Sequence, residues 1–146
     1  MNPPTGHEPI DPQAWDVRLE SGDATLDLQH RVLFELVLRT RAASVSGLGL
    51  NLHDLLAQLR AYADYHFRYE EDWIGRRAVQ PLTEWSHADL HADFRHQLGE
   101  LEALQRQGLL SVGQLHDFLY HWLLDHIVQQ DLPMIRALLR ASTATA

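Results

Sequence analysis

The sequence predicts an all-α fold, an up-down-up-down four-helix bundle that follows an extended N-terminal arm. Four amphipathic stretches repeat their apolar residues with the period of an α-helix, and glycine or proline residues separate them. The alternating apolar pattern of a half-buried strand is missing from the sequence. Long helices with short connections pack as antiparallel neighbours, so we expect residues 1–146 to form a single domain.

The N-terminal arm is expected over residues 1–14, because four prolines within them disfavour a helix. The first helix is expected over about 24–43. One stripe of this helix carries, at helical intervals, Leu26, His30, Leu33 and Val37. Gly47 and Gly49 follow, and we expect them to break the helix.

The second helix is expected over about 51–74, with Asn51 as its N-cap. Its inner face is apolar along its whole length, yet two polar residues, His66 and Glu70, fall within that face. We expect Gly75 and Pro81 to end the helix.

The third helix is expected over about 83–107, between a Thr83 cap and Gly108. Its stripe consists of His87, His91, Phe94, Leu98 and Leu101. The fourth helix is expected over about 111–139. Pro133 must kink or interrupt it, because proline removes a backbone donor and clashes with the preceding turn.

The composition excludes several classes of function. The formal net charge of −8 would repel nucleic acid and anionic membranes. The chain has no cysteine, so a bound metal must be held by imidazole, carboxylate and water, which suits iron, manganese, zinc or copper. No apolar run approaches the length of a membrane span, and the first residues do not resemble a signal peptide. We therefore expect a cytoplasmic protein.

Each predicted helix places metal-binding side chains on its apolar stripe. The set comprises His30, His66, Glu70, His87, His91, His126 and Asp131. Taken singly, an inward histidine is more often a hydrogen-bonded core residue, and a pair four residues apart also occurs on solvated faces. Together, five imidazoles and two carboxylates would be costly to bury without a cation. The set therefore predicts a metal centre inside the bundle.

The spacing on the fourth helix presents a geometric problem. His126 and Asp131 are five residues apart, so an ideal α-helix would separate their directions by about 140°. Either the Asp131 side chain reaches around the helix, or a π-bulge restores both residues to one face. The nearby Pro133 would favour such a distortion.

Four runs of this sequence resemble the ligand motifs of the hemerythrin family, the bacteriohemerythrins in particular. They are Asp27-Leu-Gln-His30, His66-Phe-Arg-Tyr-Glu70, His87-Ala-Asp-Leu-His91 and His126-Ile-Val-Gln-Gln-Asp131. The resemblance covers about 15–139, and every ligand position holds the expected residue type in the expected order.

The resemblance implies a non-haem di-iron centre with an oxo or hydroxo bridge. Glu70 and Asp131 would bridge the two ions. One ion would be held by His87, His91 and His126, and the other by His30 and His66, which leaves a position open for molecular oxygen. The expected activity is reversible oxygen binding rather than enzymatic turnover, for storage, for delivery to an oxygen-consuming enzyme, or for sensing.

The resemblance also implies a dry oxygen pocket, for which the candidates are Phe67, Trp122 and Leu123. Plain core packing is the alternative role for these three side chains, and the two roles are compatible. The other histidines match no motif, and we expect them at the surface or beside the ligands: His7, His53, His96, His116 and His121.

A ferritin-like di-iron oxidase or iron-handling protein is the main alternative. Such sites use Glu-x-x-His on two helices and a glutamate on each of the other two. This chain has a single Glu-x-x-His, at Glu84 and His87. Carboxylate-rich sites stabilise the high-valent iron that oxidation needs, so the nitrogen-rich set favours oxygen carriage. A sensor or interaction module that changes shape on binding oxygen or iron is a second alternative.

Overall fold

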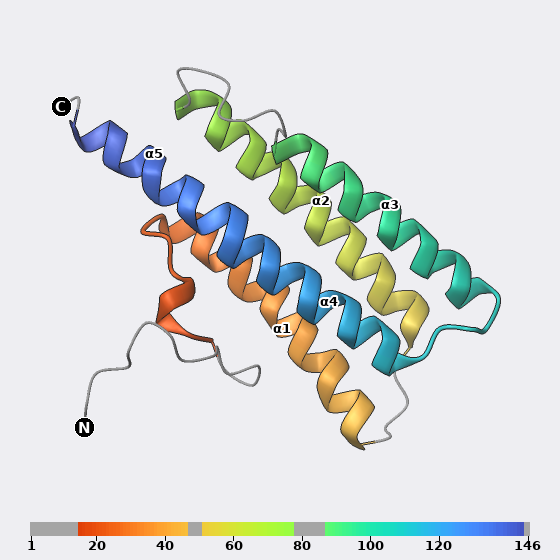
Figure 1. Cartoon of the computed structure of the whole chain (residues 1–146). Helices are drawn as coiled ribbons and strands as arrows, with labels where there is room; N and C mark the ends of the chain where they lie inside the picture. The colour runs from red at the N-terminus through yellow and green to blue at the C-terminus, as the bar shows by residue number, and fades with distance from the viewer. Residues whose placement is uncertain (1–14, 47–50, 78–86, 145–146) are drawn as a thin grey trace, which may run out of the picture.

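The computed structural model describes residues 15–46, 51–77 and 87–144, and all the regular structure within them is helical. A 3₁₀ turn, Val17–Leu19, precedes α1 (Ala24–Ser46), α2 (Leu52–Arg77), α3 (His87–Arg106), α4 (Val112–His126) and α5 (Leu132–Ala144). A π-helical segment, Ile127–Asp131, joins α4 to α5, so the two continue along one line (Figure 1). The predicted all-α four-helix bundle is confirmed.

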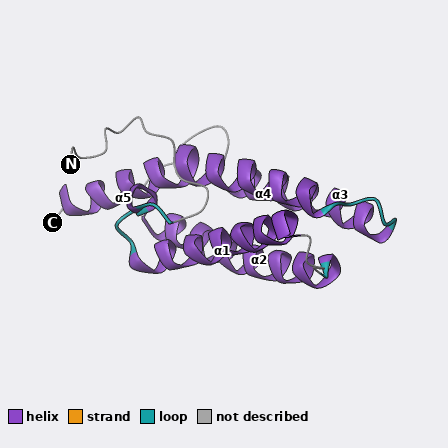
Figure 2. Cartoon of the chain, turned by 90° about the horizontal axis from the view of Figure 1, so that it is seen from below, coloured by secondary structure: helices purple, strands orange, loops and turns teal. Residues whose placement is uncertain are grey.

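The bundle has four rods, namely α1, α2, α3 and the continuous α4–α5 helix. The helices lie roughly side by side in both views, and α1 packs against α2 and α4 while α2 packs against α3 (Figures 1 and 2). None of the described helices is both long and apolar enough to span a bilayer. The predicted arm, the Thr83 cap and the breaks at Gly47, Gly49 and Pro81 lie outside the described residues.

Two polar side chains cap the starts of α2 and α4, and one glycine follows the end of α3, as the sequence indicates. The Asn51 side-chain oxygen accepts a hydrogen bond from the Asp54 amide at 3.1 Å. Ser111 and Gln114 form a reciprocal capping box at the start of α4. Gly108 has a φ of 71°, which a glycine adopts without strain, and its amide and the next one bond back into α3. These contacts keep the connection between α3 and α4 short.

Three helices extend beyond their predicted ends. Helix α2 passes through Gly75 to Arg77, and the guanidinium groups of Arg76 and Arg77 donate to the Asp72 and Trp73 carbonyls. Cationic side chains in the last turn interact favourably with the negative end of the helix dipole, which offsets the cost of one glycine. Helix α1 continues beyond residue 43 to Ser46, and α5 continues beyond residue 139 to Ala144. Neither extension contains a glycine or proline that would end a helix.

The fourth rod resolves the five-residue spacing through its backbone. The Leu132 amide donates to the Ile127 carbonyl, an i to i−5 bond of the π type. The wide turn brings Asp131 to the same side as His126, and their Oδ1 and Nε2 atoms lie 2.9 Å apart. Pro133 comes directly after Leu132. Because proline has no amide hydrogen, it could not donate an α-helical hydrogen bond at this point. The π-bulge is therefore the explanation that holds.

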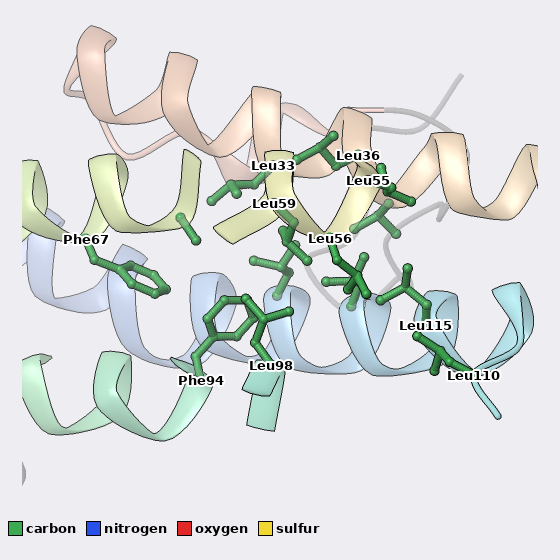
Figure 3. Close-up of a cluster of buried hydrophobic side chains, with 14 residues drawn as sticks. Leu33, Leu36, Leu55, Leu56, Leu59, Phe67, Phe94, Leu98, Leu110 and Leu115 are labelled. Carbon is green, nitrogen blue, oxygen red and sulfur yellow. The ribbon is translucent and has the colours of Figure 1, made fainter. Parts of the chain in front are cut away.

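The metal-binding side chains occupy a polar layer between two apolar clusters of the core. The larger cluster is leucine-rich and extends from Leu110 and Leu115 at one end to Phe67 at the other (Figure 3). The smaller cluster comprises Leu26, Trp73, Ile135 and Leu138. Along α1, α2 and the α4–α5 rod the chain passes from one cluster to the other through the candidate ligands, for example from Leu26 through His30 to Leu33 on α1. Apolar side chains therefore lie at both ends of this layer.

Candidate metal centre

All seven candidate ligands converge between the four rods, in two overlapping clusters. In each cluster the ligand atoms lie within 4.8 Å of one another. One cluster contains three histidines, His87, His91 and His126, and the other contains His30 and His66. Glu70 and Asp131 belong to both. We call these the three-histidine cluster and the two-histidine cluster.

Each shared carboxylate presents one oxygen to each cluster. Oε1 of Glu70 lies 2.6 Å from Nε2 of His87 and 3.2 Å from Nε2 of His91. Its other oxygen, Oε2, lies 3.5 Å from Nε2 of His30 and 3.4 Å from Nε2 of His66. A carboxylate whose two oxygens face separate imidazole groups has the geometry of a ligand that bridges two ions.

Asp131 repeats this arrangement from the opposite rod. Its Oδ1 lies 2.6 Å from Nε2 of His87 and 2.9 Å from Nε2 of His126. Its Oδ2 lies 3.1 Å from Nε2 of His30. Two carboxylates from α2 and the π-segment therefore face both clusters, and this places the clusters side by side.

The burial of these groups fits a bound cation. Glu70, His30, His91 and Asp131 are each 0% exposed. Both Glu70 oxygens, Nε2 of His30, His91 and His126, and Oδ2 of Asp131 have no hydrogen-bond partner within the described part of the chain. Buried polar atoms without partners are costly, and a metal ion would satisfy all of them.

The spacing of the facing atoms agrees with this interpretation. Several of them approach within hydrogen-bond distance without the geometry of a hydrogen bond, since the 3.1 Å contact of His30 with Asp131 leaves both atoms unsatisfied. Neighbouring ligand atoms of an octahedral ion with bonds of about 2.1 Å lie about 3.0 Å apart. Contacts of 2.6 to 3.5 Å are therefore those expected around one ion.

The local electrostatics favour ionised carboxylates. Burial raises the pKa of Glu70, but the close approach of the surrounding imidazoles outweighs this effect and holds the pKa well below its usual range. Two of these imidazoles shift in the opposite direction: burial lowers the pKa values of His30 and His87, yet Asp131 and Glu70 raise them to about 9 and about 10. A cation would displace the protons of these two imidazoles, so we expect metal binding to release protons.

Aromatic rings support the three-histidine cluster from outside. Phe67 stacks on His91 with centroids 3.9 Å apart and planes 8° apart. Trp122 stacks on His126 at 4.5 Å and 15°. These stacks fix the ring planes of two ligands, a role that the sequence pattern did not indicate for either aromatic residue. Leu123 is 3% exposed and belongs to the larger apolar cluster with Phe67.

A further contact that the sequence reasoning missed involves Gln29. This residue precedes His30 and is buried, and its Oε1 lies 2.7 Å from Nδ1 of His66. The available signal was its position inside the Asp27-Leu-Gln-His30 run, where a polar residue borders a ligand on the buried side of the helix.

The remaining described histidines lie outside both clusters. His53, His96 and His121 are exposed and His116 is half-buried, whereas His7 lies outside the described residues. His121 lines a groove of about 540 Å³ between α3 and α4 that Trp122 and His126 also line.

His121 and His126 therefore provide a matched test of the register of α4. His121→Ala should retain the full metal content of the parent protein, because His121 belongs to neither cluster. His126→Ala should lose at least one ion per chain, because it removes one of the three imidazoles of its cluster. Metal analysis of the purified variants measures both outcomes. The opposite pattern would show that the ligand assignment on α4 is wrong.

Comparisons with known proteins give a consistent result. A family profile described as "Hemerythrin HHE cation binding domain" matches residues 21–138. The chain is 31% identical over 121 residues to myohemerythrin-1 of Phascolopsis gouldii, which covers 83% of this chain and 90% of that protein. It is 23% identical over 123 residues to bacteriohemerythrin of Clostridium acetobutylicum, covering 80% and 94% of the two chains.

A third relative has a different length. An uncharacterized protein of Archaeoglobus fulgidus is 38% identical over 84 residues, which cover 57% of this chain but only 22% of the archaeal protein. No solved structure gives a significant match.

Proposed function

Because the chain belongs to the hemerythrin family, we propose that it is a non-haem di-iron protein that binds molecular oxygen reversibly and is not an enzyme. The observation that supports this most strongly is the pair of shared carboxylates. Each has one oxygen toward the three-histidine cluster and the other toward the two-histidine cluster. Storage, delivery to an oxygen-consuming enzyme and sensing are all uses that this chemistry would serve.

The unequal histidine clusters explain why one ion would react with oxygen. His87, His91 and His126 would hold one ion, His30 and His66 would hold the other, and Glu70 and Asp131 would be shared between them. The ion of the two-histidine cluster would have one imidazole fewer, so it could accept an exogenous ligand. Iron there would supply reversible electron donation to oxygen. The protein orients the ligands and, through the apolar clusters, excludes water.

The donor set favours this function over a ferritin-like oxidase. Within the two clusters the protein offers five imidazoles and two carboxylates, whereas ferritin-like sites take most of their ligands from glutamates. Imidazoles are neutral, so this set compensates less positive charge and disfavours the high-valent iron that oxidation chemistry requires.

The direct test is the iron content and visible spectrum of the protein purified from iron-replete cells. We expect about two irons per chain, as the two clusters require. The ferrous protein should gain a visible absorption band in air and lose it when oxygen is removed, through repeated cycles. One iron per chain, zinc in place of iron, or an irreversible colour change with oxygen consumption would contradict the proposal.

A further inference from the structure

Gln29 lies behind the two-histidine cluster, on the side away from the carboxylates. It is 2% exposed on α1, and its Oε1 accepts a hydrogen bond of 2.7 Å from Nδ1 of His66 on α2. Its amide nitrogen has no partner among the described residues. Burying an amide is costly unless it is hydrogen-bonded, so the bond to His66 is the interaction that accounts for a glutamine at this position.

The bond determines which nitrogen of His66 is free. A hydrogen on Nδ1 that is donated to Gln29 leaves the lone pair on Nε2. That atom lies 3.4 Å from Oε2 of Glu70, on the side where the ion would lie. Consecutive residues on a helix point about 100° apart. Gln29 and His30 therefore point in different directions from α1. His30 faces the two carboxylates, whereas Gln29 contacts His66 on the neighbouring helix α2.

Two other imidazoles, those of His30 and His91, are not supported in this way. Nδ1 of His30 has no hydrogen-bond partner within the described chain. In the three-histidine cluster, Nδ1 of His91 faces a carboxylate, with Oε2 of Glu71 at 3.6 Å. A neutral amide thus lies behind one cluster and a negative group behind the other. An anionic partner makes an imidazole a stronger electron donor than a neutral partner does.

We propose that Gln29 is a positioning residue for His66, which holds the imidazole in the tautomer that binds metal and, being neutral, limits the electron density at the ion of the two-histidine cluster. The first half requires only that the site binds a divalent metal. The second half rests on the proposed di-iron function. The two halves have separate tests.

The first test measures metal binding by the metal-free protein, with Co²⁺ as the probe. Gln29→Met keeps the length of the side chain and removes the acceptor. We expect one of the two Co²⁺ ions to bind about 10- to 100-fold more weakly, the usual effect of losing such a partner, while the other binds as in the parent. Gln29→Glu restores an acceptor and should recover two-ion binding. Gln58→Met, at an exposed glutamine of α2, should bind as the parent does.

The second test measures the reduction potential of the iron-loaded protein. Gln29→Glu adds an anionic acceptor, so we expect a lower reduction potential and faster loss of the oxygenated form. Gln29→Met should not lower the potential, because it adds no charge. A residue that only fills space would shift neither quantity in this charge-dependent manner.

The outcomes separate this inference from the proposed function. Two-ion binding in Gln29→Met with parental affinities would overturn the positioning role. A potential that is equal in Gln29→Glu and the parent would overturn the electronic role. A parent protein that takes up a single Co²⁺ would contradict the di-metal centre itself. Thermal unfolding of the metal-free variants identifies any effect that comes from a loss of folding alone.

Discussion

Glu70→Ala is expected to abolish binding of both metal ions. Glu70 is fully buried, and its two oxygens face separate histidine clusters, so its loss removes one ligand from each ion. A ligand that binds only the folded state stabilises it by about 4 kcal/mol when its concentration is 1,000 times its Kd. The variant should therefore lose the increase in Tm that added iron produces in the parent.

The measurement combines metal analysis with thermal unfolding in the presence and absence of ferrous iron. Asp72→Ala is the matched control, because it removes an exposed carboxylate of the same helix that pairs with Arg76. This control should retain two ions and the full increase in Tm. If Glu70→Ala retained both ions, the bridging role assigned to this carboxylate would be wrong.

Leu123→Asn should accelerate loss of the oxygenated form by about tenfold or more while both irons remain bound. Leu123 lies one turn before His126 and is almost fully buried. We propose that it shields the open coordination position from water together with Phe67 and Trp122. A polar side chain there would admit water and supply protons, which promote the release of reduced oxygen and leave ferric iron. The decay of the oxygenated spectrum in air, beside the iron content, measures the effect.

Leu119→Asn is the matched control for this experiment. Leu119 is buried in the same apolar cluster one turn further from the ligands, so a polar group there should cost similar stability. Its decay rate should remain near that of the parent. Leu123→Ala, which opens a cavity without adding a polar group, serves if Leu123→Asn does not fold. Equal decay rates in all of these proteins would leave Leu123 a packing residue.

The helical fold and the candidate ligands could be predicted from the sequence because both depend on local periodicity. A residue on the apolar stripe of a helix is directed inward whatever its neighbours are, so His30 and His66 could be placed in the core without a structure. The end of α2 could not be predicted in the same way. Gly75 is a weak breaker, and the arginines beyond it donate to carbonyls of the preceding turn and favour the helix dipole.

The tertiary structure decided what the inward side chains do to one another. The sequence left two explanations for the spacing of His126 and Asp131, and the π-helical bond from Leu132 to Ile127 selects one of them. The resemblance implied that Glu70 bridges two ions, and the structure places each of its oxygens toward a separate cluster. The sequence did not indicate that Gln29 supports His66. Periodicity specifies which face of a helix is buried, but the contacts between atoms of different helices depend on how far each helix is rotated and shifted against its neighbours.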